Sequence, residues 1–78
     1  GATIFPNPVQ SGQQITIMTQ QPNQLGGVQL VNQLGQLVKV WRDSKDVQIP
    51  EVSSGNYFLQ LLSENQQVRS VHKIFIKE

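Results

Sequence analysis

Hydrophobic and polar residues alternate with a period of two along most of the chain. Such alternation predicts β-strands, because successive side chains of a strand point to opposite faces of a sheet. Turn signals rich in Gly, Pro, Asn and Ser separate the alternating segments at intervals of roughly 8–12 residues, as in β-sandwiches. The pattern predicts about seven short strands, within 1–5, 14–19, 28–31, 36–42, 47–50, 52–62 and 68–77. No segment of useful length carries the apolar stripe of a helix, so we expect almost no helix.

The stretch Val52–Leu62 is expected to form the central strand. Its residues Tyr57, Leu59 and Leu61 share one face, which predicts that they point into the core. Gly55 places a residue that can take a positive φ just before this strand begins. In Ig-like sandwiches a Tyr at such a corner sends its hydroxyl back to the backbone a few residues upstream. The sequence therefore predicts an all-β, Ig-like antiparallel β-sandwich that forms a single domain over residues 1–78.

The opposite face of the same strand also carries apolar side chains. Phe58 and Leu62 are expected to point away from the core. A cluster of these residues with Leu37 or Trp41 would mark an interaction surface, whereas coverage by a neighbouring loop is the plainer alternative. The sequence does not decide whether Trp41 caps the edge of the core or lies on the outer face.

The composition removes several classes of protein from consideration. The chain has 78 residues and no Cys, so neither a disulfide nor a Cys-based zinc site can reinforce its small core. A net charge of +1, from scattered basic residues, gives no electrostatic signature of binding to nucleic acid or to an anionic membrane. No apolar run approaches the roughly 20 residues of a membrane span, and no signal peptide is evident. We expect no cofactor and no nucleic-acid partner.

Candidate catalytic and metal-binding residues are few. His72 is the only His, and a triad with one of the Asp residues could use Ser53, Ser54 or Ser70. The sequence has neither a nucleophile elbow nor a Gly-rich oxyanion loop, so we expect no enzyme and take His72 as a half-exposed residue of the last strand. Asp43 and Asp46 flank one turn and could share a calcium ion. They lack the ligand spacing of a calcium loop, which favours a solvated turn.

The last predicted strand, Val68–Lys77, carries the clearest candidates for recognition. Lys73 and Lys77 lie on one face with Phe75 between them. Lys residues on an edge strand discourage pairing between sheets, and the same edge could instead accept the strand of a partner. The residues alone favour neither role. An exposed edge strand would also permit a dimer.

Four elements occur in a characteristic order. They are Ile4–Pro8, Val28–Asn32 followed by Gly35 and Val38, Val52–Phe58 with Leu59, and His72–Lys77. Together they resemble the C-terminal sorting domain of the type IX secretion system of Bacteroidetes bacteria, over nearly the whole chain. The residues that match the motifs of that family are Pro6, Asn7, Pro8, Gly35, Gly55 and Tyr57. Departures are mild: Phe5 replaces a Tyr, Asn32 a common Asp, and Val52 a usual Leu.

The resemblance implies a signal and not an effector. Such a domain ends a larger cargo protein, attached at its N-terminal side, that reaches the periplasm by an ordinary signal peptide. The outer-membrane translocon recognises the folded domain, and a sortase-like protease usually cleaves upstream of it. The cargo is then anchored at the cell surface or released. The candidate residues for translocon recognition are Lys73, Phe75, Lys77 and Glu78.

A different function class competes with this interpretation. An Ig-like accessory module could bind carbohydrate or another cell-surface ligand for a larger secreted protein. It would need a row of exposed aromatic residues beside polar groups, for which only Trp41, Phe58 and Phe75 are available.

Overall fold

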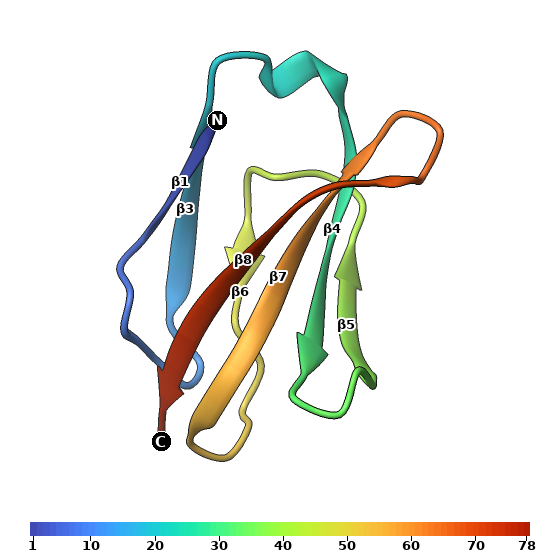
Figure 1. Ribbon diagram of the computed structural model, residues 1–78. Coiled ribbons are helices and arrows are strands. Elements are labelled where there is room, and N and C mark those ends of the chain that lie inside the picture. Colours follow the sequence, from blue (N-terminus) through green and yellow to red (C-terminus); the bar gives the residue numbers. More distant parts are fainter.

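Two β-sheets pack face to face in the computed structural model, which describes residues 1–78 (Figure 1). One sheet has three strands in the order β1-β3-β6, and the other has five in the order β2-β8-β7-β4-β5. The strands are β1 (Ala2–Phe5), β2 (Val9–Gln10), β3 (Gln14–Thr19), β4 (Leu25–Asn32), β5 (Leu37–Trp41), β6 (Val47–Gln48), β7 (Gly55–Ser63) and β8 (Val68–Lys77). A single 3-10 turn, Pro22–Gln24, is the only helical element, and no helix has the length and apolarity needed to cross a membrane. The all-β, Ig-like sandwich is confirmed.

The predicted strands agree with the structure except around β2 and β4. Strands β3 and β8 have the bounds expected from the alternation. Strand β4 begins at Leu25, three residues before the start of the strand predicted within 28–31. Strand β2 was not predicted, because a strand of two residues is too short to show an alternation.

One pair of strands departs from the antiparallel arrangement of the sandwich. Strand β1 pairs antiparallel with β3 in the small sheet, whereas β2 pairs parallel with β8 in the large sheet. The chain therefore changes sheets at Pro6–Pro8, where both X-Pro peptide bonds are cis. A crossing from one layer to the other lets one short N-terminal segment contribute strands to both layers.

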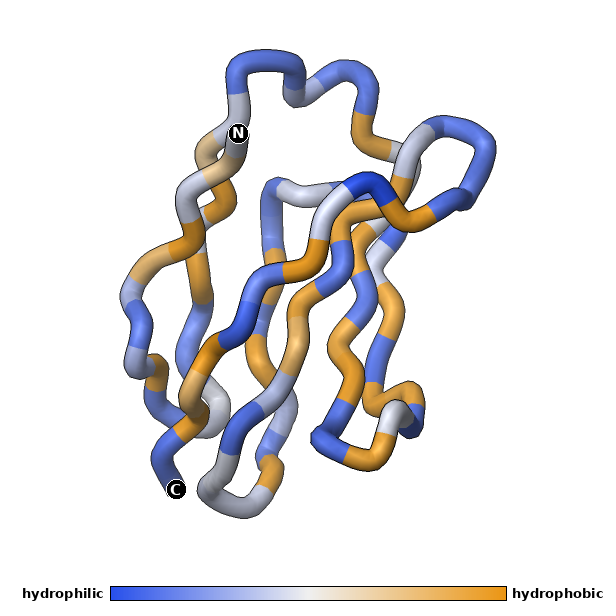
Figure 2. The backbone as a smooth tube through the Cα atoms, in the orientation of Figure 1, coloured by the Kyte–Doolittle hydropathy of each residue, from blue (hydrophilic) through white to orange (hydrophobic).

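The core lies between the sheets and draws on both of them. Tyr57, Leu59 and Leu61 of β7 are buried, as predicted, and β7 pairs with β4 on one side and β8 on the other. The central position of this strand is thus confirmed. The core cluster has 11 buried residues: Val9, Ile15, Val28, Leu30, Val47, Ile49, Tyr57, Leu59, Leu61, Ile74 and Ile76. Figure 2 shows the alternation of apolar and polar residues along the strands that supply them.

Leu62 is buried, with only 4% of its surface exposed, although it points away from this core cluster. Of the two alternatives for this residue, coverage by a neighbouring segment therefore holds, and Leu62 is not part of an exposed patch. Irregularities in the β4–β7 and β7–β8 pairings lie next to it, and such bulges redirect side chains and neighbouring backbone. A Cβ atom built on Gly27 would lie 3.6 Å from Leu62 Cδ1 and 3.7 Å from Gln66 Oε1. Leu62 thus packs against a glycine, beside the hairpin that joins β7 to β8.

The Tyr corner forms as predicted, but not through Gly55. Tyr57 donates its hydroxyl proton to the carbonyl oxygen of Ser53 at 2.8 Å. Gly55 does not use its freedom to take a positive φ, because it is not among the glycines with positive φ. It is already the first residue of β7 and pairs with Ile76, which holds it in extended geometry.

The β4–β5 hairpin does need a glycine. Gly35 has φ +81°, the left-handed region expected for it, and its N–H donates to the carbonyl oxygen of Asn32 at 3.0 Å. The Asn32 side-chain oxygen accepts the N–H groups of Leu34 and Gln36, both at 2.9 Å. The Asp that is common at this position in the sorting-domain family could accept the same two bonds, so its replacement by Asn32 preserves the turn.

Candidate recognition surface

Alternate residues of β8 face the core and the solvent. Ile74 and Ile76 are buried in the core, whereas Lys73, Phe75 and Lys77 point outward and are exposed. Phe75 leaves 38% of its surface open to solvent. The structure therefore brings three of the four predicted recognition residues onto one face of one strand.

Glu78 follows directly and is tied to the β6–β7 connection. Its backbone N–H donates to Ser54 Oγ at 2.8 Å, while its side chain is exposed. The fourth predicted residue thus lies at the same end of the large sheet as Lys77.

The outer face of the large sheet continues this surface across neighbouring strands. The register places Lys73 beside Phe58, Phe58 beside Val31, and Val31 beside Leu37. Leu37 is 58% exposed, whereas Val31 is buried beneath its neighbours. Phe58 and Leu37 therefore lie in one row on the outer face, on either side of Val31.

A second row crosses the same face one step further along the strands. Val71 pairs with Gln60, Gln60 with Gln29, and Gln29 with Val40. Gln29 Nε2 donates to Gln60 Oε1 at 2.6 Å, which links the two amides across neighbouring strands. Because exposed apolar patches mark interaction sites, this face is the main candidate for contact with a protein partner.

Trp41 does not belong to the outer face. It packs partly against the core, and Lys39 Nζ lies 5.7 Å from the centre of its ring. The structure thus decides between the two positions left open for Trp41. Because Trp41 is separated from Phe58 and Phe75, the three aromatics form no continuous row of the kind that a carbohydrate module needs.

Asn7 gives the Pro-Asn-Pro motif a function that sequence reasoning missed. Its Nδ2 donates to the carbonyl oxygen of Lys73, and its Oδ1 accepts the N–H of Phe75, both at 3.1 Å. These two bonds imitate a neighbouring strand on the edge of β8 that faces away from β7. Immediately after Asn7, β2 pairs with Ile76 and Lys77 on the same edge. The expectation that all of β8 presents a free edge is therefore wrong for its C-terminal part.

Ser11 is a second tie that the sequence did not reveal. Its hydroxyl accepts the N–H of Val52 at 2.9 Å and lies 3.1 Å from the Val52 carbonyl oxygen. Its own N–H donates to the carbonyl oxygen of Lys77. Ser11 therefore holds the end of β2 against both β8 and the segment before β7. Sequence alone shows only a Ser-Gly turn signal here.

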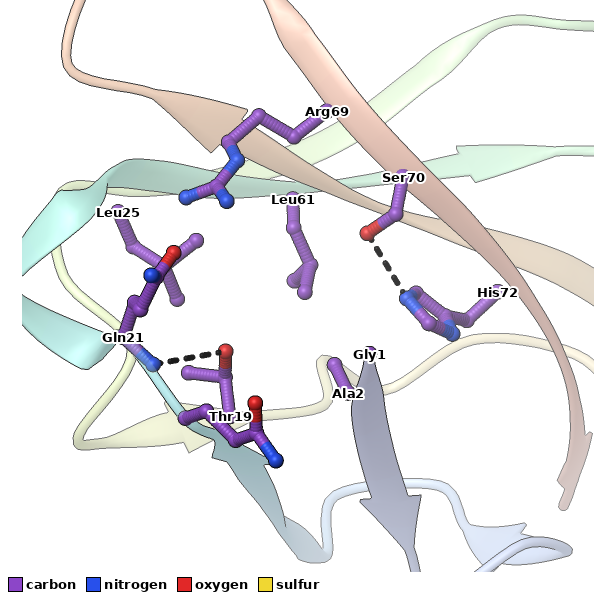
Figure 3. Close-up of a pocket in the computed structure, with 10 residues that line it drawn as sticks. Gly1, Ala2, Thr19, Gln21, Leu25, Leu61, Arg69, Ser70 and His72 are labelled. Atoms are coloured by element: carbon purple, nitrogen blue, oxygen red, sulfur yellow. Dashed lines mark hydrogen bonds between the residues drawn. The ribbon is translucent and has the colours of Figure 1, made fainter.

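The candidate catalytic residues are only partly brought together. Ser70 Oγ lies 2.9 Å from His72 Nε2 at the wall of a surface cavity (Figure 3), and none of the residues that line the cavity has a carboxylate. His72 is half-buried, as expected. The triad alternatives with Ser53 and Ser54 are not assembled, because His72 pairs with Leu59, four residues beyond Gly55 along β7.

The two turn carboxylates are engaged by protein donors. Asp43 Oδ1 accepts the N–H of Lys45 at 3.0 Å, and Asp46 Oδ1 accepts from Gln14 Nε2 at 3.2 Å. These contacts are those of a solvated polar turn.

The fold and this surface define the chain as a small Ig-like β-sandwich domain with an apolar outer sheet face. Residues 3–77 match a family model described as a secretion system C-terminal sorting domain. The chain therefore belongs to this family, the C-terminal sorting signals of type IX secretion. No curated protein matches it in sequence.

Membership in the family gives the function of the chain. It is a sorting signal that directs an attached cargo across the outer membrane to the cell surface or the outside, which requires interaction with the secretion machinery. A signal of this kind is not a catalytic domain. Neither the fold nor the family match favours the Ig-like binding module.

Proposed function

We propose that residues 1–78 act as one folded unit that the outer-membrane translocon recognises at the end of β8. The recognition residues are Lys73, Phe75, Lys77 and Glu78. One observation carries this assignment: the outward residues of β8 alternate with the buried Ile74 and Ile76. The strand that completes the core thus also presents two cations around an exposed aromatic ring. Recognition by these side chains depends on folding, because only the folded sheet aligns them on one face.

The remaining steps concern the cargo. The domain passes through the periplasm joined to the C-terminal side of its cargo, and a sortase-like protease cleaves upstream of it after export. The cargo is then anchored at the cell surface or released. The domain contributes no catalytic group to these steps. Its family membership supports this sequence of events, and its Cys-free core supports a signal that folds without disulfide formation.

The test uses side-chain replacements, because truncation would not separate recognition from folding. Removal of residues 73–78 would also remove Ile74 and Ile76 from the core. The informative variant is therefore Lys73→Gln, Phe75→Thr and Lys77→Gln combined, fused to a reporter with a signal peptide in a host that has this secretion system. All three replacements keep strand-compatible side chains on the outer face.

A matched control changes the same chemistry elsewhere on the surface. It combines Met18→Thr with Lys39→Gln and Lys45→Gln, which removes one exposed apolar residue and two cations from other strands and loops. Circular dichroism is used first to check that both variants fold. We expect the control to reach the cell surface and the β8 variant to stay in the periplasm. Equal surface delivery of the two folded variants would refute the assignment of these residues.

A further inference from the structure

The edge of β8 is free over its N-terminal part. Asn7 bonds the Lys73 carbonyl and the Phe75 N–H, and β2 covers only Ile76 and Lys77. Backbone groups that face the edge recur at every second residue of a strand, so those of Val71 lie on the same side as the groups that Asn7 binds. The N–H of Lys73 also lies on this side. These are the groups to which another strand could pair.

A cavity of about 310 Å³ lies beside this free edge, at the open side of the sandwich between β1 and β8 (Figure 3). Ser70 and His72 take the inward positions on β8 that Ile74 and Ile76 hold further along. The apolar core therefore gives way to a polar recess here, with Leu61 at its floor. Figure 3 shows the Arg69 guanidinium extending over the recess.

The ionisable side chains that line this recess are all basic. Arg69 and His72 are the lining side chains that can carry a positive charge, and no carboxylate lines the cavity. An added acidic side chain would therefore meet an arginine without a competing acid in the recess, and would find the Ser70 hydroxyl within the same wall. Charge complementarity selects an anionic partner group.

We infer that the free edge of β8 and this recess bind an extended acidic peptide as an added β-strand. Side chains of a strand alternate between faces, so one set of peptide residues would face the recess and the other would extend the outer face of the large sheet. The first set carries the carboxylates that meet Arg69. The second set is apolar, because it continues a face on which Val68 and Val71 are about half exposed. This site uses the backbone of Lys73 but none of the recognition side chains proposed above, and it does not depend on them.

The test is an NMR titration of the 78-residue chain with defined peptides. The probe is a capped peptide of about seven residues, a typical strand length, in which Val alternates with Glu. The control peptide alternates Val with Lys. We expect the Glu peptide to shift the amide signals of Val71 and Lys73 and to slow their hydrogen exchange, while the Lys peptide has no effect at the same concentration. Binding should weaken as salt is added.

Two pairs of variants separate the backbone contribution from the charge. Val71→Pro removes the edge N–H without removing a donor from the β7–β8 ladder, whereas Val71→Thr keeps that N–H. We expect the first to abolish binding and the second to preserve it. Arg69→Gln should weaken binding by up to about fivefold, as for an exposed ion pair, and Lys45→Gln should not change it.

Several results would overturn the inference. They are binding of both peptides alike, unchanged binding by a folded Val71→Pro variant, and the absence of shifts at Val71 and Lys73 at millimolar peptide. Self-association through this edge without binding of the Glu peptide would instead assign the edge to a second copy of the chain. Because the titration is done on the isolated chain, its failure leaves the export test of Lys73, Phe75 and Lys77 unaffected.

Discussion

Replacement of Tyr57 tests whether the Tyr corner acts through the stability of the fold. Tyr57→Phe removes one hydroxyl, which donates to the Ser53 carbonyl oxygen at 2.8 Å, and leaves the ring in place. Ser53 is exposed, so water can replace the lost donor. A hydrogen bond of this kind contributes about 1 kcal/mol to the free energy of unfolding.

Tyr57→Ala is a much larger perturbation, because the ring is 7% exposed and belongs to the core cluster. Truncation of a buried aromatic to Ala typically costs about 3–5 kcal/mol. A domain of this length has a total stability of roughly 4–12 kcal/mol, so the loss is a large fraction of the whole. We expect Tyr57→Ala to unfold partly or completely and Tyr57→Phe to remain folded.

Urea denaturation followed by the fluorescence of Trp41 measures both changes, since this single Trp packs partly against the core. With a slope of about 1–1.5 kcal/mol per molar urea, Tyr57→Phe should lower the midpoint by roughly 0.7–1 M. Export of a fused reporter should persist for Tyr57→Phe and fail for Tyr57→Ala. An unchanged midpoint for Tyr57→Phe would refute the corner bond, and a folded Tyr57→Ala domain that is not exported would show a direct role in recognition.

Three further substitutions probe how the backbone is held. Gly55→Ala should change the free energy of unfolding by less than about 1 kcal/mol, because the residue has no positive φ and an added Cβ would meet only the Tyr57 ring at 3.9 Å. Gly26→Ala should lower the free energy of unfolding by about 2–4 kcal/mol, since its Cβ would collide with the Ser63 backbone carbonyl. Thermal melts that show equal stability for Gly55→Ala and Gly26→Ala would contradict these two predictions. Asn7→Ala should cost about 1–2 kcal/mol and speed hydrogen exchange at Phe75, whereas unchanged exchange would show that the side chain does not cap β8.

The sequence by itself determined most of the strands and the identity of the corner. A period of two reports which residues of one strand share a face, and this is a local property of the chain. It therefore predicted that Tyr57, Leu59 and Leu61 lie in the core and that Lys73, Phe75 and Lys77 share an outward face. The ordered motifs were sufficient to indicate the sorting-domain family.

Only the tertiary structure decided the features that depend on which distant segments meet. Leu62 faces away from the core and is buried against Gly27 beside a bulge, whereas the alternation left open whether it was exposed or covered. The glycine required by a close approach is Gly26 and not Gly55, because the approaching carbonyl belongs to another strand. Asn7 caps β8 through bonds to residues 66 and 68 positions away in the sequence. Local patterns carry no information about such contacts, since their partners are fixed only when the sheets assemble.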